Sequence, residues 1–424
     1  MLKKLKENML VPYLALVFLI LAFVFAKPNE LMSGMGMILT SPSVLLTDYI
    51  ALAGLGATLL NSGILVMFSY GIVRITKIPI TGPVFAGLLT IAGFSFFGMN
   101  ILNSSIIFFG VFLYSKYKEM HFRSVIVILL FSAGLAPIAS VIMFGLGLQL
   151  LIGIPLGVLV GVSSGFILME LAPHVIKFHN GYDLYNVGFA GGIIALLAYS
   201  VIKLTNHSYE VEAVFTTDRH LELLIIALAI TITAMIVGFI ANGNSLKEYK
   251  NILRKSGRAI TDFTRKNREG IALFNSGLTG FLIIAIILAL GIKLSGPSFG
   301  AILTVVGFGC FGKHPRNIIP GVFGVVLSAL IFNLEFDSIL VTLALIFSTT
   351  LAPISGEYGI IPGVIAGMLH LPVINNLGSL HGGIILYSNG FAAAFTAVLI
   401  HMAITAFERS DKKWQFMKLK KTSK

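Results

Sequence analysis

The sequence has 424 residues, of which 56% are hydrophobic and 11% are charged. A soluble domain carries roughly 25% charged residues, so this chain lacks the polar surface needed to cover itself in water. Its formal net charge of +12 lies in loops and tails, which argues against a soluble nucleic-acid-binding protein. Apolar runs near the ~20 residues that cross a hydrocarbon core recur from Val11 to Phe407. Composition therefore predicts an all-α polytopic membrane protein.

The N-terminus allows two interpretations. Residues 1–8 are basic and residues 9–26 are apolar, and Val24-Phe25-Ala26 resembles a cleavable small-residue site. The stretch is either a signal peptide or an uncleaved first helix. We expect the helix, because hydrophobic segments follow throughout the chain.

An internal repeat dominates the rest of the sequence. Residues 214 positions apart match without a gap, and the matches include Asn, Gly and Pro rather than apolar residues alone. The matched pairs are Asp48 with Asp262, Asn61-Ser62-Gly63 with Asn275-Ser276-Gly277, Gly82-Pro83 with Gly296-Pro297, and Asn103 with Asn317. With small changes of offset, Leu135-Ala136-Pro137-Ile138 matches Leu351-Ala352-Pro353-Ile354, and His179 and Leu184-Tyr185 match His381 and Leu386-Tyr387. The chain is therefore a duplication.

In chain order we predict about 14 transmembrane segments (12–14), as a leading helix, two repeats of six segments, and a helix linking them. The leading helix lies near 10–26, and the first repeat's segments lie near 52–73, 83–98, 102–115, 124–143, 149–169 and 184–203. The linking helix lies near 221–242, and the second repeat's segments lie near 270–292, 297–311, 317–332, 338–354, 359–373 and 383–406. The corresponding domains are 1–44, 45–204 (repeat one), 205–269 (linker helix and basic loop), 270–407 (repeat two) and 408–424 (basic tail).

The positions of Lys and Arg predict the orientation of these segments. With the basic N-terminus in the cytoplasm, alternation places the basic stretches 116–123, 243–269 and 412–424 inside, and Lys313 with Arg316 inside as well. The acidic stretch 210–218 falls outside. Repeat one then starts outside and repeat two starts inside, so we expect inverted-topology repeats. We predict a multi-pass protein of the cytoplasmic membrane with both termini in the cytoplasm.

Enzyme signatures are absent from the sequence. It contains no paired metal-ligand motif, no phosphate-binding loop and no nucleophile elbow. The single cysteine, Cys310, lies within an apolar run, so neither a disulfide nor a thiolate metal site is predicted. We expect no enzymatic activity, no cofactor and no metal.

Paired interruptions of the apolar segments are the best pointer to a binding region. Gly82-Pro83 and Gly296-Pro297 are such a pair. They are either two half-helices whose N-termini face a solute or tight turns between helices. Asn61-Ser62 and Asn275-Ser276 either line a pore or satisfy helix ends and neighbouring helices.

A second group of candidates precedes the last segment of each repeat. Tyr185 with Asn186, and Tyr387 with Asn389, are either interfacial anchors or solute contacts. His179 and His381 are candidates for proton coupling, with an ordinary interface histidine as the alternative. We expect no duplicated Asp or Glu deep in both halves, which argues modestly against ion coupling.

Two family resemblances follow from these motifs. The whole chain resembles a family of bacterial membrane proteins that contain a duplicated domain of unknown function. Phe274-Asn275-Ser276-Gly277-Leu278-Thr279-Gly280 is also similar to the Asn-Asn-Pro-Leu-Thr-Gly stretch of urea transporters, without its proline, and Leu386-Tyr387-Ser388-Asn389-Gly390 is similar to their Leu-Tyr-Gly-Tyr-Asn stretch. The second resemblance implies a homo-trimer of narrow pores that pass a small neutral amide.

Two functions remain open on this basis. The first is a channel or facilitator for a small neutral polar solute, with its pore between inverted repeats. The second is an ion-coupled secondary transporter of a small organic solute or anion. The expected partners are the lipid bilayer and the solute, with no nucleic acid.

Overall fold

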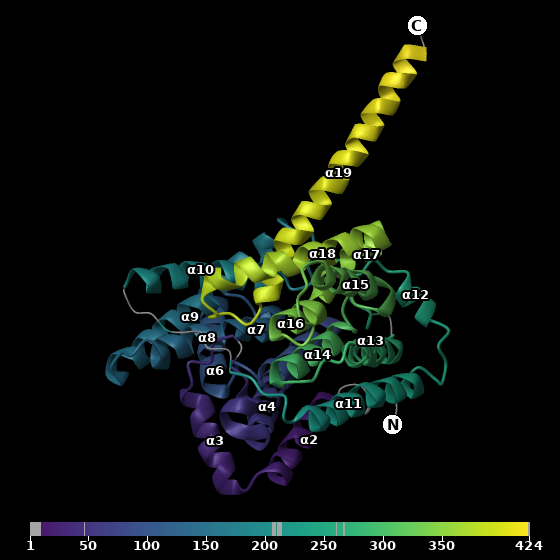
Figure 1. Cartoon of the computed structure of the whole chain (residues 1–424). Helices are drawn as coiled ribbons and strands as arrows, with labels where there is room; N and C mark the ends of the chain where they lie inside the picture. The colour runs from purple at the N-terminus through teal and green to yellow at the C-terminus, as the bar shows by residue number, and fades with distance from the viewer. Residues whose placement is uncertain are drawn as a thin grey trace.

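The computed structural model describes residues 10–45, 47–205, 209, 214–259, 261–265 and 268–422, with side chains as far as Phe407. Within these ranges the chain is helical and holds no β-sheet, only three isolated backbone bridges. This confirms the all-α class. Figure 1 shows the helices packed into one body, from which α19 runs out to the C-terminus.

The two halves contain matching series of long helices, although among the described residues the short elements η1, η3 and η5 occur in one half only. The first half comprises α2 (Leu10–Phe25), α3 (Pro28–Thr40), α4 (Tyr49–Ile75), α5 (Gly82–Phe94), α6 (Ile101–Tyr117), η1 (Phe122–Val125), α7 (Ile126–Ser132), η2 (Ala133–Leu135), α8 (Ala136–Ser140), η3 (Val141–Gly145), α9 (Leu150–Val175) and α10 (Asn186–Leu204). The second half comprises α11 (His220–Ala241), α12 (Tyr249–Leu253), α13 (Glu269–Ala289), α14 (Gly296–Phe308), α15 (Pro315–Ile331), α16 (Ile339–Phe347), η4 (Ser348–Leu351), α17 (Ala352–Tyr358), α18 (Ile360–Leu377), η5 (Gly378–His381) and α19 (Ser388–Thr422).

Every predicted segment contains a helix, and the helices α5 and α14, like α6 and α15, have the same bounds once the 214-residue offset is applied. The structure adds two helices that the sequence did not predict. One is α3, which bends away from α2 by 116°, and the other is the short α12, within the stretch predicted as a basic loop. The leading helix α2 and the linking helix α11 also occupy equivalent positions in the two halves. Gly63 of α4 packs on Ala15 and Leu19 of α2, and Gly277 of α13 packs on Thr231 and Met235 of α11. Each repeat therefore includes its preceding helix.

The helices differ in whether they can cross a bilayer alone. Among the described residues, nine helices are long and apolar enough, or ten if the bent pair α2–α3 forms one span. Four shorter apolar helices, α5, α6, α14 and α15, complete the set. A helix of 13 residues such as α5 is about 20 Å long, too short for a core of about 30 Å. Its residues Val84–Phe94 are all buried, so other helices enclose it.

Proline breaks one span in each repeat. Pro137 and Pro353 lie in the first turn of α8 and α17, directly after the short 3₁₀ turns η2 and η4. Proline lacks an N–H and disrupts the preceding turn, which explains the break. Irregular backbone survives at membrane depth only when protein or a water-filled cavity surrounds it. Accordingly, these two broken spans are the most enclosed of the candidate spans: 89% and 83% of their apolar stretches are buried inside the protein.

The halves meet about a pseudo-two-fold axis at the centre. Gly93 of α5 lies against the carbonyl of Gly300 in α14, while Gly307 of α14 lies against Ala86 of α5. These contacts run in opposite sequence directions, so the two helices are antiparallel. An axis between antiparallel helices is perpendicular to them, which is the relation expected of repeats that face opposite ways.

Reciprocal backbone hydrogen bonds join the repeats around this axis. The N–H of Leu386 donates to the carbonyl of Gly134 at 3.0 Å, and that of Leu184 donates to Thr350 at 3.2 Å. Likewise Leu45 donates to Gly383 at 2.7 Å and Ala259 donates to Gly181 at 3.0 Å. These bonds tie loops of one repeat to loops of the other, so the two halves form one body.

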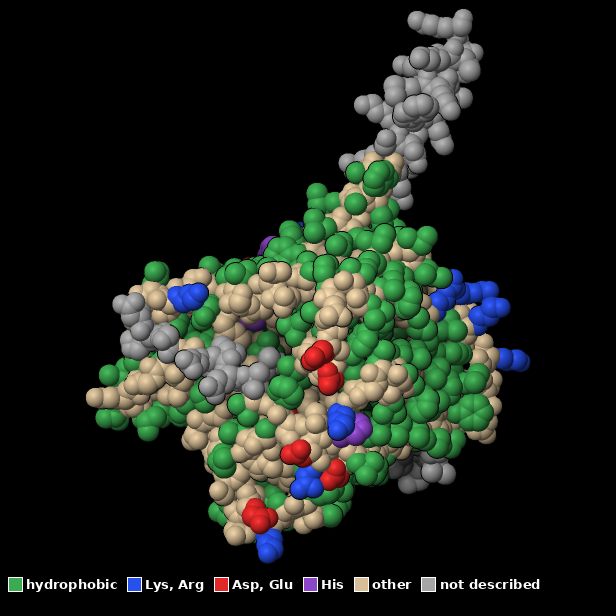
Figure 2. All heavy atoms as spheres, in the orientation of Figure 1, with side chains coloured by type: hydrophobic (Ala, Val, Ile, Leu, Met, Phe, Trp, Pro, Cys, Tyr) green, Lys and Arg blue, Asp and Glu red, His purple; other side chains and the backbone are tan. Residues whose placement is uncertain are grey.

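The surface is broadly apolar, as the space-filling view of Figure 2 shows. In that view one group of basic side chains lies beside the position of α12, and the acidic side chains lie in the centre and lower part of the molecule with further basic ones among them. The helices α2 and α11 lie close together at the lower edge of Figure 1 and border an apolar groove.

Cysteine labelling can test the predicted orientation. Lys250 of α12 and Asp337, before α16, are both exposed, and the native Cys310 is buried. We expect Lys250→Cys to react with a membrane-impermeant maleimide only from the cytoplasmic side, and Asp337→Cys only from the opposite side. Labelling of both variants from one side would refute the predicted topology of the second half.

Candidate functional site

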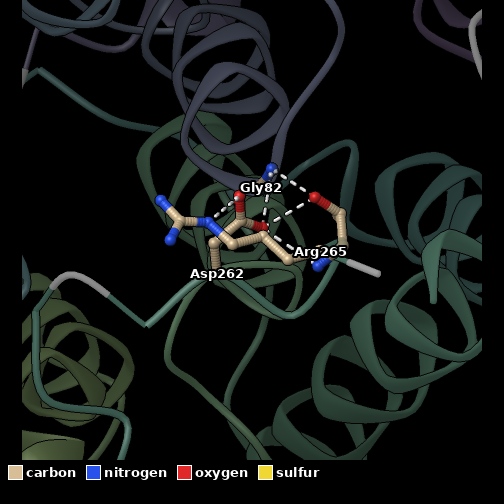
Figure 3. Close-up of polar contacts among 4 residues, drawn as sticks. Gly82, Asp262 and Arg265 are labelled. Carbon is tan, nitrogen blue, oxygen red and sulfur yellow. Dashed lines mark hydrogen bonds and ion pairs between the residues drawn. The ribbon is translucent and has the colours of Figure 1, made fainter. Parts of the chain in front are cut away.

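The Gly-Pro interruptions do begin short helices, and a carboxylate from the opposite repeat caps each of them. Asp262 accepts a hydrogen bond from the N–H of Gly82 at 3.2 Å, and Thr264 accepts from the same N–H at 3.1 Å (Figure 3). In the symmetric position Asp48 accepts from the N–H of Gly296 at 3.1 Å. A solute at either N-terminus would have to displace a protein carboxylate.

These aspartates correct one expectation from the sequence. Asp48 and Asp262 are duplicated acids, and both side chains are buried, with Asp262 only 3% exposed. Asp48 precedes an apolar run, which in a sequence resembles an ordinary solvent-facing helix cap. Asp48 does cap α4 by accepting from the N–H of Ile50, and it also binds Gly296, 248 residues away in the other repeat.

The Asn-Ser pairs satisfy backbone carbonyls at the far ends of the same short helices. Asn61 donates to the carbonyls of Ser95 and Met99, both at 2.8 Å. Asn275 donates to those of Gly309 at 2.7 Å and Lys313 at 2.8 Å. Ser62 and Ser276 donate to carbonyls at the symmetric positions Ala92 and Val306. This geometry fits the helix-end alternative rather than a pore lining.

Alanine at either asparagine should therefore reduce stability. Asn61→Ala or Asn275→Ala leaves two buried carbonyls without donors, at about 1–3 kcal/mol each. We expect each variant to unfold at a lower temperature in detergent, measured by intrinsic fluorescence. Exposed Asn376→Ala, whose side chain bonds only within its own helix, is the matched control and should melt like the wild type.

The two histidines hold the loops that lead into α10 and α19. His179 Nε2 lies 2.9 Å from Asn186 Oδ1, and His381 Nε2 lies 2.9 Å from Ser388 Oγ. The Nδ1 atoms accept from the N–H groups of Asp183 and Gly383, each at 3.3 Å. Since both nitrogens of each ring are engaged, taking up a proton would require a bond to break. Proton coupling by these residues stays a prediction.

Tyr185 and Tyr387 meet where the two repeats join. Their ring centroids are 6.4 Å apart, and each tyrosine packs on the glycine of the other's helix, Gly390 for Tyr185 and Gly188 for Tyr387. Both are buried, so they are not interfacial anchors. Asn389 bonds His370 Nε2 at 3.0 Å, and Asn186 donates to the carbonyl of Ala172 at 2.9 Å.

A polar cluster surrounds Tyr185, and we call it the central cluster; its members are Asp183, Tyr185, Lys313, Thr349 and Thr350. The ammonium of Lys313 donates to Tyr185 Oη at 2.6 Å and to Thr349 Oγ1 at 2.8 Å. Asp183 Oδ1 accepts from the N–H of Tyr185 at 2.9 Å and from Thr350 Oγ1 at 2.6 Å. All five are buried, although an ionisable group in a membrane interior is costly and usually functional.

The sequence interpretation misplaced Lys313. We predicted it as a cytoplasmic loop charge, whereas its side chain is fully buried between α14 and α15. A lysine in a short connection between apolar segments resembles an orienting charge. The connection instead folds inward, because Asn275 binds the carbonyl of Lys313 and holds it at the centre.

The central cluster exists on one side of the pseudo-axis only. The repeat register places Met99 where the other half has Lys313, and Ile385 opposite Asp183. Ala133 and Gly134 correspond to Thr349 and Thr350. Only the tyrosine is shared. Four of the five polar groups therefore have no counterpart in the other copy and are not part of the shared repeat pattern.

A cavity of about 340 Å³ approaches the cluster from one side. Its lining includes Phe97, Phe347, Leu386, Ser388 and Asn389. The ring of Phe347 is 5.8 Å from that of Tyr185, and Leu386 adjoins Tyr387. One layer of apolar side chains thus separates the cavity from the central cluster.

These features define a polytopic all-α membrane protein made of two related repeats with a polar centre. A model of the family described as "Protein of unknown function (DUF1576)" matches residues 27–204 and 241–406, and the chain belongs to this family. The match covers both halves, which confirms the predicted resemblance to a family with a duplicated domain. No curated protein and no solved structure matches the chain, so the likeness to urea transporters rests on the short motifs alone.

Proposed function

We propose that this protein is a gated, ion-coupled secondary transporter of a small organic solute or anion, rather than an enzyme or an open channel. The observation that carries the proposal is the central cluster, which holds the buried ionisable side chains of Asp183 and Lys313 where the two opposed repeats meet. In transporters built from inverted repeats, the solute site lies at the repeat interface, near the bilayer midplane. Buried ionisable groups in membranes mark such pathways.

The barriers on the two sides of the cluster support gating. On one side the cavity ends at Phe97, Phe347 and Leu386. Its other walls include Leu45 and Leu340, which the predicted topology assigns to the extracytoplasmic side. A solute in this cavity would reach Tyr185 once that single layer moved.

The opposite side is closed by the basic stretch before α13. Arg258 donates to the carbonyl of Asn180 at 2.6 Å, and its guanidinium lies 4.5 Å from the centre of the Tyr182 ring. The hydroxyl of Tyr182 is bonded to Tyr358 at 2.7 Å. The predicted topology places this closure toward the cytoplasm, so the arrangement suits an outward-facing state of an alternating-access cycle.

The geometry gives less support to the channel hypothesis. Asn61, Ser62, Asn275 and Ser276, the candidates for a pore lining, use their donor groups on backbone carbonyls. The N-termini at Gly82 and Gly296 are capped by aspartates. A polar pore through these residues would require several of these bonds to break.

Flux measurements on the purified protein in proteoliposomes test the proposal. We expect saturable uptake of a radiolabelled probe, L-lactate or formate, that rises when a pH or sodium gradient is imposed. Passive, unsaturable permeation of urea, independent of any gradient, would overturn the proposal in favour of the channel. Absence of flux for these three probes, with protein shown to be folded and inserted, would count against transport altogether.

A further inference from the structure

We infer that the central cluster binds one small monoanion at Lys313 together with one proton at Asp183, so that transport is electroneutral anion–proton symport. This inference deepens the proposed function and rests on it. It names the class of solute, the coupling ion and the residue that takes each.

The first observation is that Lys313 has no acidic partner. None of the described carboxylates forms an ion pair with it, and its two hydrogen bonds go to neutral hydroxyls. An ammonium has three donors, so one remains for a ligand. A buried cation without a paired anion is costly. The site is therefore suited to an anion that arrives from outside the protein.

The second observation is that polar groups of two residues beside Tyr185, the residue that Lys313 bonds, have no partner among the described residues. Within the described part of the chain, Asp183 Oδ2 and the Tyr387 hydroxyl are buried and have no hydrogen-bonding partner. Buried polar atoms are nearly always bonded, so unsatisfied ones need an explanation. A proton on Oδ2 turns this carboxyl oxygen into a donor, and the Tyr387 hydroxyl is a second one, so both could bond an anion's oxygens.

Charge balance sets the stoichiometry. Asp183 and Lys313 interact electrostatically, and with both ionised the empty site is neutral. An added monoanion would leave one net negative charge in a low-dielectric interior, which is costly. A proton bound to Asp183 cancels that charge. The empty and loaded sites then carry the same net charge. The protein can therefore change between its outward- and inward-facing states with the site either empty or loaded.

Among the described groups near the site, none binds that proton as readily as Asp183. The titratable groups facing Asp183 are His179, Lys313 and Tyr185, and Tyr387 faces Tyr185. His179 has both ring nitrogens engaged, and its Nδ1 accepts from the N–H of Asp183 itself. The tyrosines are hydrogen-bond donors at neutral pH and have no proton to gain.

The repeat supplies the key variants. Lys313→Met installs the residue that the first half carries at the equivalent position. Asp183→Asn keeps the shape and one acceptor oxygen while removing the titratable group. Lys293→Met removes an exposed lysine outside the site and is the matched control.

Binding is measured first, by thermal shift in detergent with sodium nitrate, formate or L-lactate, and with urea as the neutral probe. We expect at least one anion to raise the melting temperature of the wild type and of Lys293→Met, because ligands stabilise the state they bind. Lys313→Met should weaken that anion's apparent affinity about 30-fold or more, as expected for a lost hydrogen bond to a charged group. Stabilisation by urea alone, or anion binding that survives in Lys313→Met, would overturn the inference.

Coupling is then measured in proteoliposomes that contain a pH-sensitive dye, with the anion found above. The wild type should take up one proton per anion, driven by a pH gradient and unchanged by a potassium diffusion potential. Asp183→Asn should keep anion exchange across the membrane but lose accumulation driven by the pH gradient. Uptake that follows the membrane potential, or gradient-driven uptake in Asp183→Asn, would overturn proton coupling while leaving gated transport standing. Complete absence of gradient-dependent flux would instead overturn the proposed function.

Discussion

Replacing Asp48 with alanine is expected to lower the free energy of unfolding by about 3–6 kcal/mol, the largest loss of stability that we predict for a single residue. The Asp48 carboxylate is fully buried and accepts from three backbone N–H groups. The donors are Ile50 at 2.8 Å, Gly296 at 3.1 Å and Thr216 at 3.3 Å. Alanine leaves all three without an acceptor at a point where α4, α14 and the segment before α11 meet.

The symmetric variant should be milder. Asp262 also caps a short helix, but Thr264 Oγ1 already accepts from the same Gly82 N–H and can retain the cap. We therefore expect Asp262→Ala to melt at a temperature between those of Asp48→Ala and the wild type. The measurement is thermal unfolding in detergent, together with the monodisperse fraction on size exclusion.

Two comparisons separate the cap from a general effect of removing an acid. Asp48→Asn keeps one oxygen in place and should recover part of the stability. Asp218→Ala removes an exposed carboxylate two residues after Thr216 and should leave the melting temperature unchanged. If Asp48→Ala were as stable as the wild type, the reciprocal caps would not be what joins the two repeats.

Much of the fold can be predicted from the sequence, because the patterns that determine it lie within single segments or recur in both repeats. Apolar runs of membrane length predict helices, and a shared register of Asn, Gly and Pro predicts two copies of one unit. The broken spans at Pro137 and Pro353 follow from the missing proline N–H. The antiparallel packing of α5 on α14 agrees with the loop charges, although no pattern within one repeat reveals that contact.

The site was less predictable, because its chemistry depends on which half a residue belongs to. The candidates were mostly repeated residues, and those with partners in their own repeat, such as Asn61 and Asn275, support helix ends. The buried charges are the residues that break the repeat, Lys313 opposite Met99 and Asp183 opposite Ile385. Comparing the two copies for mismatched charges would have found both. A search for shared motifs passes over them.

That asymmetry leads to the second large effect, a stability cycle on the charged pair. Lys313→Met alone leaves Asp183 as a buried charge without its positive neighbour, and Asp183→Asn alone does the same to Lys313. The two groups form no direct ion pair but interact electrostatically, and an uncompensated charge left in a protein interior costs about 3–5 kcal/mol. We therefore expect each single variant to unfold at a clearly lower temperature than the wild type in detergent.

The double variant Lys313→Met/Asp183→Asn should behave differently. It contains no buried charge, its methionine has a precedent in the other repeat, and its asparagine can still accept from the N–H of Tyr185 and from Thr350. Replacing opposite buried charges with neutral groups of similar size is often neutral or stabilising, so we expect a melting temperature at or above that of the wild type. Losses that simply add would mean that the two charges do not interact. A double variant that is stable but does not transport would mean that the chain keeps this pair for the solute, because the fold is at least as stable without it.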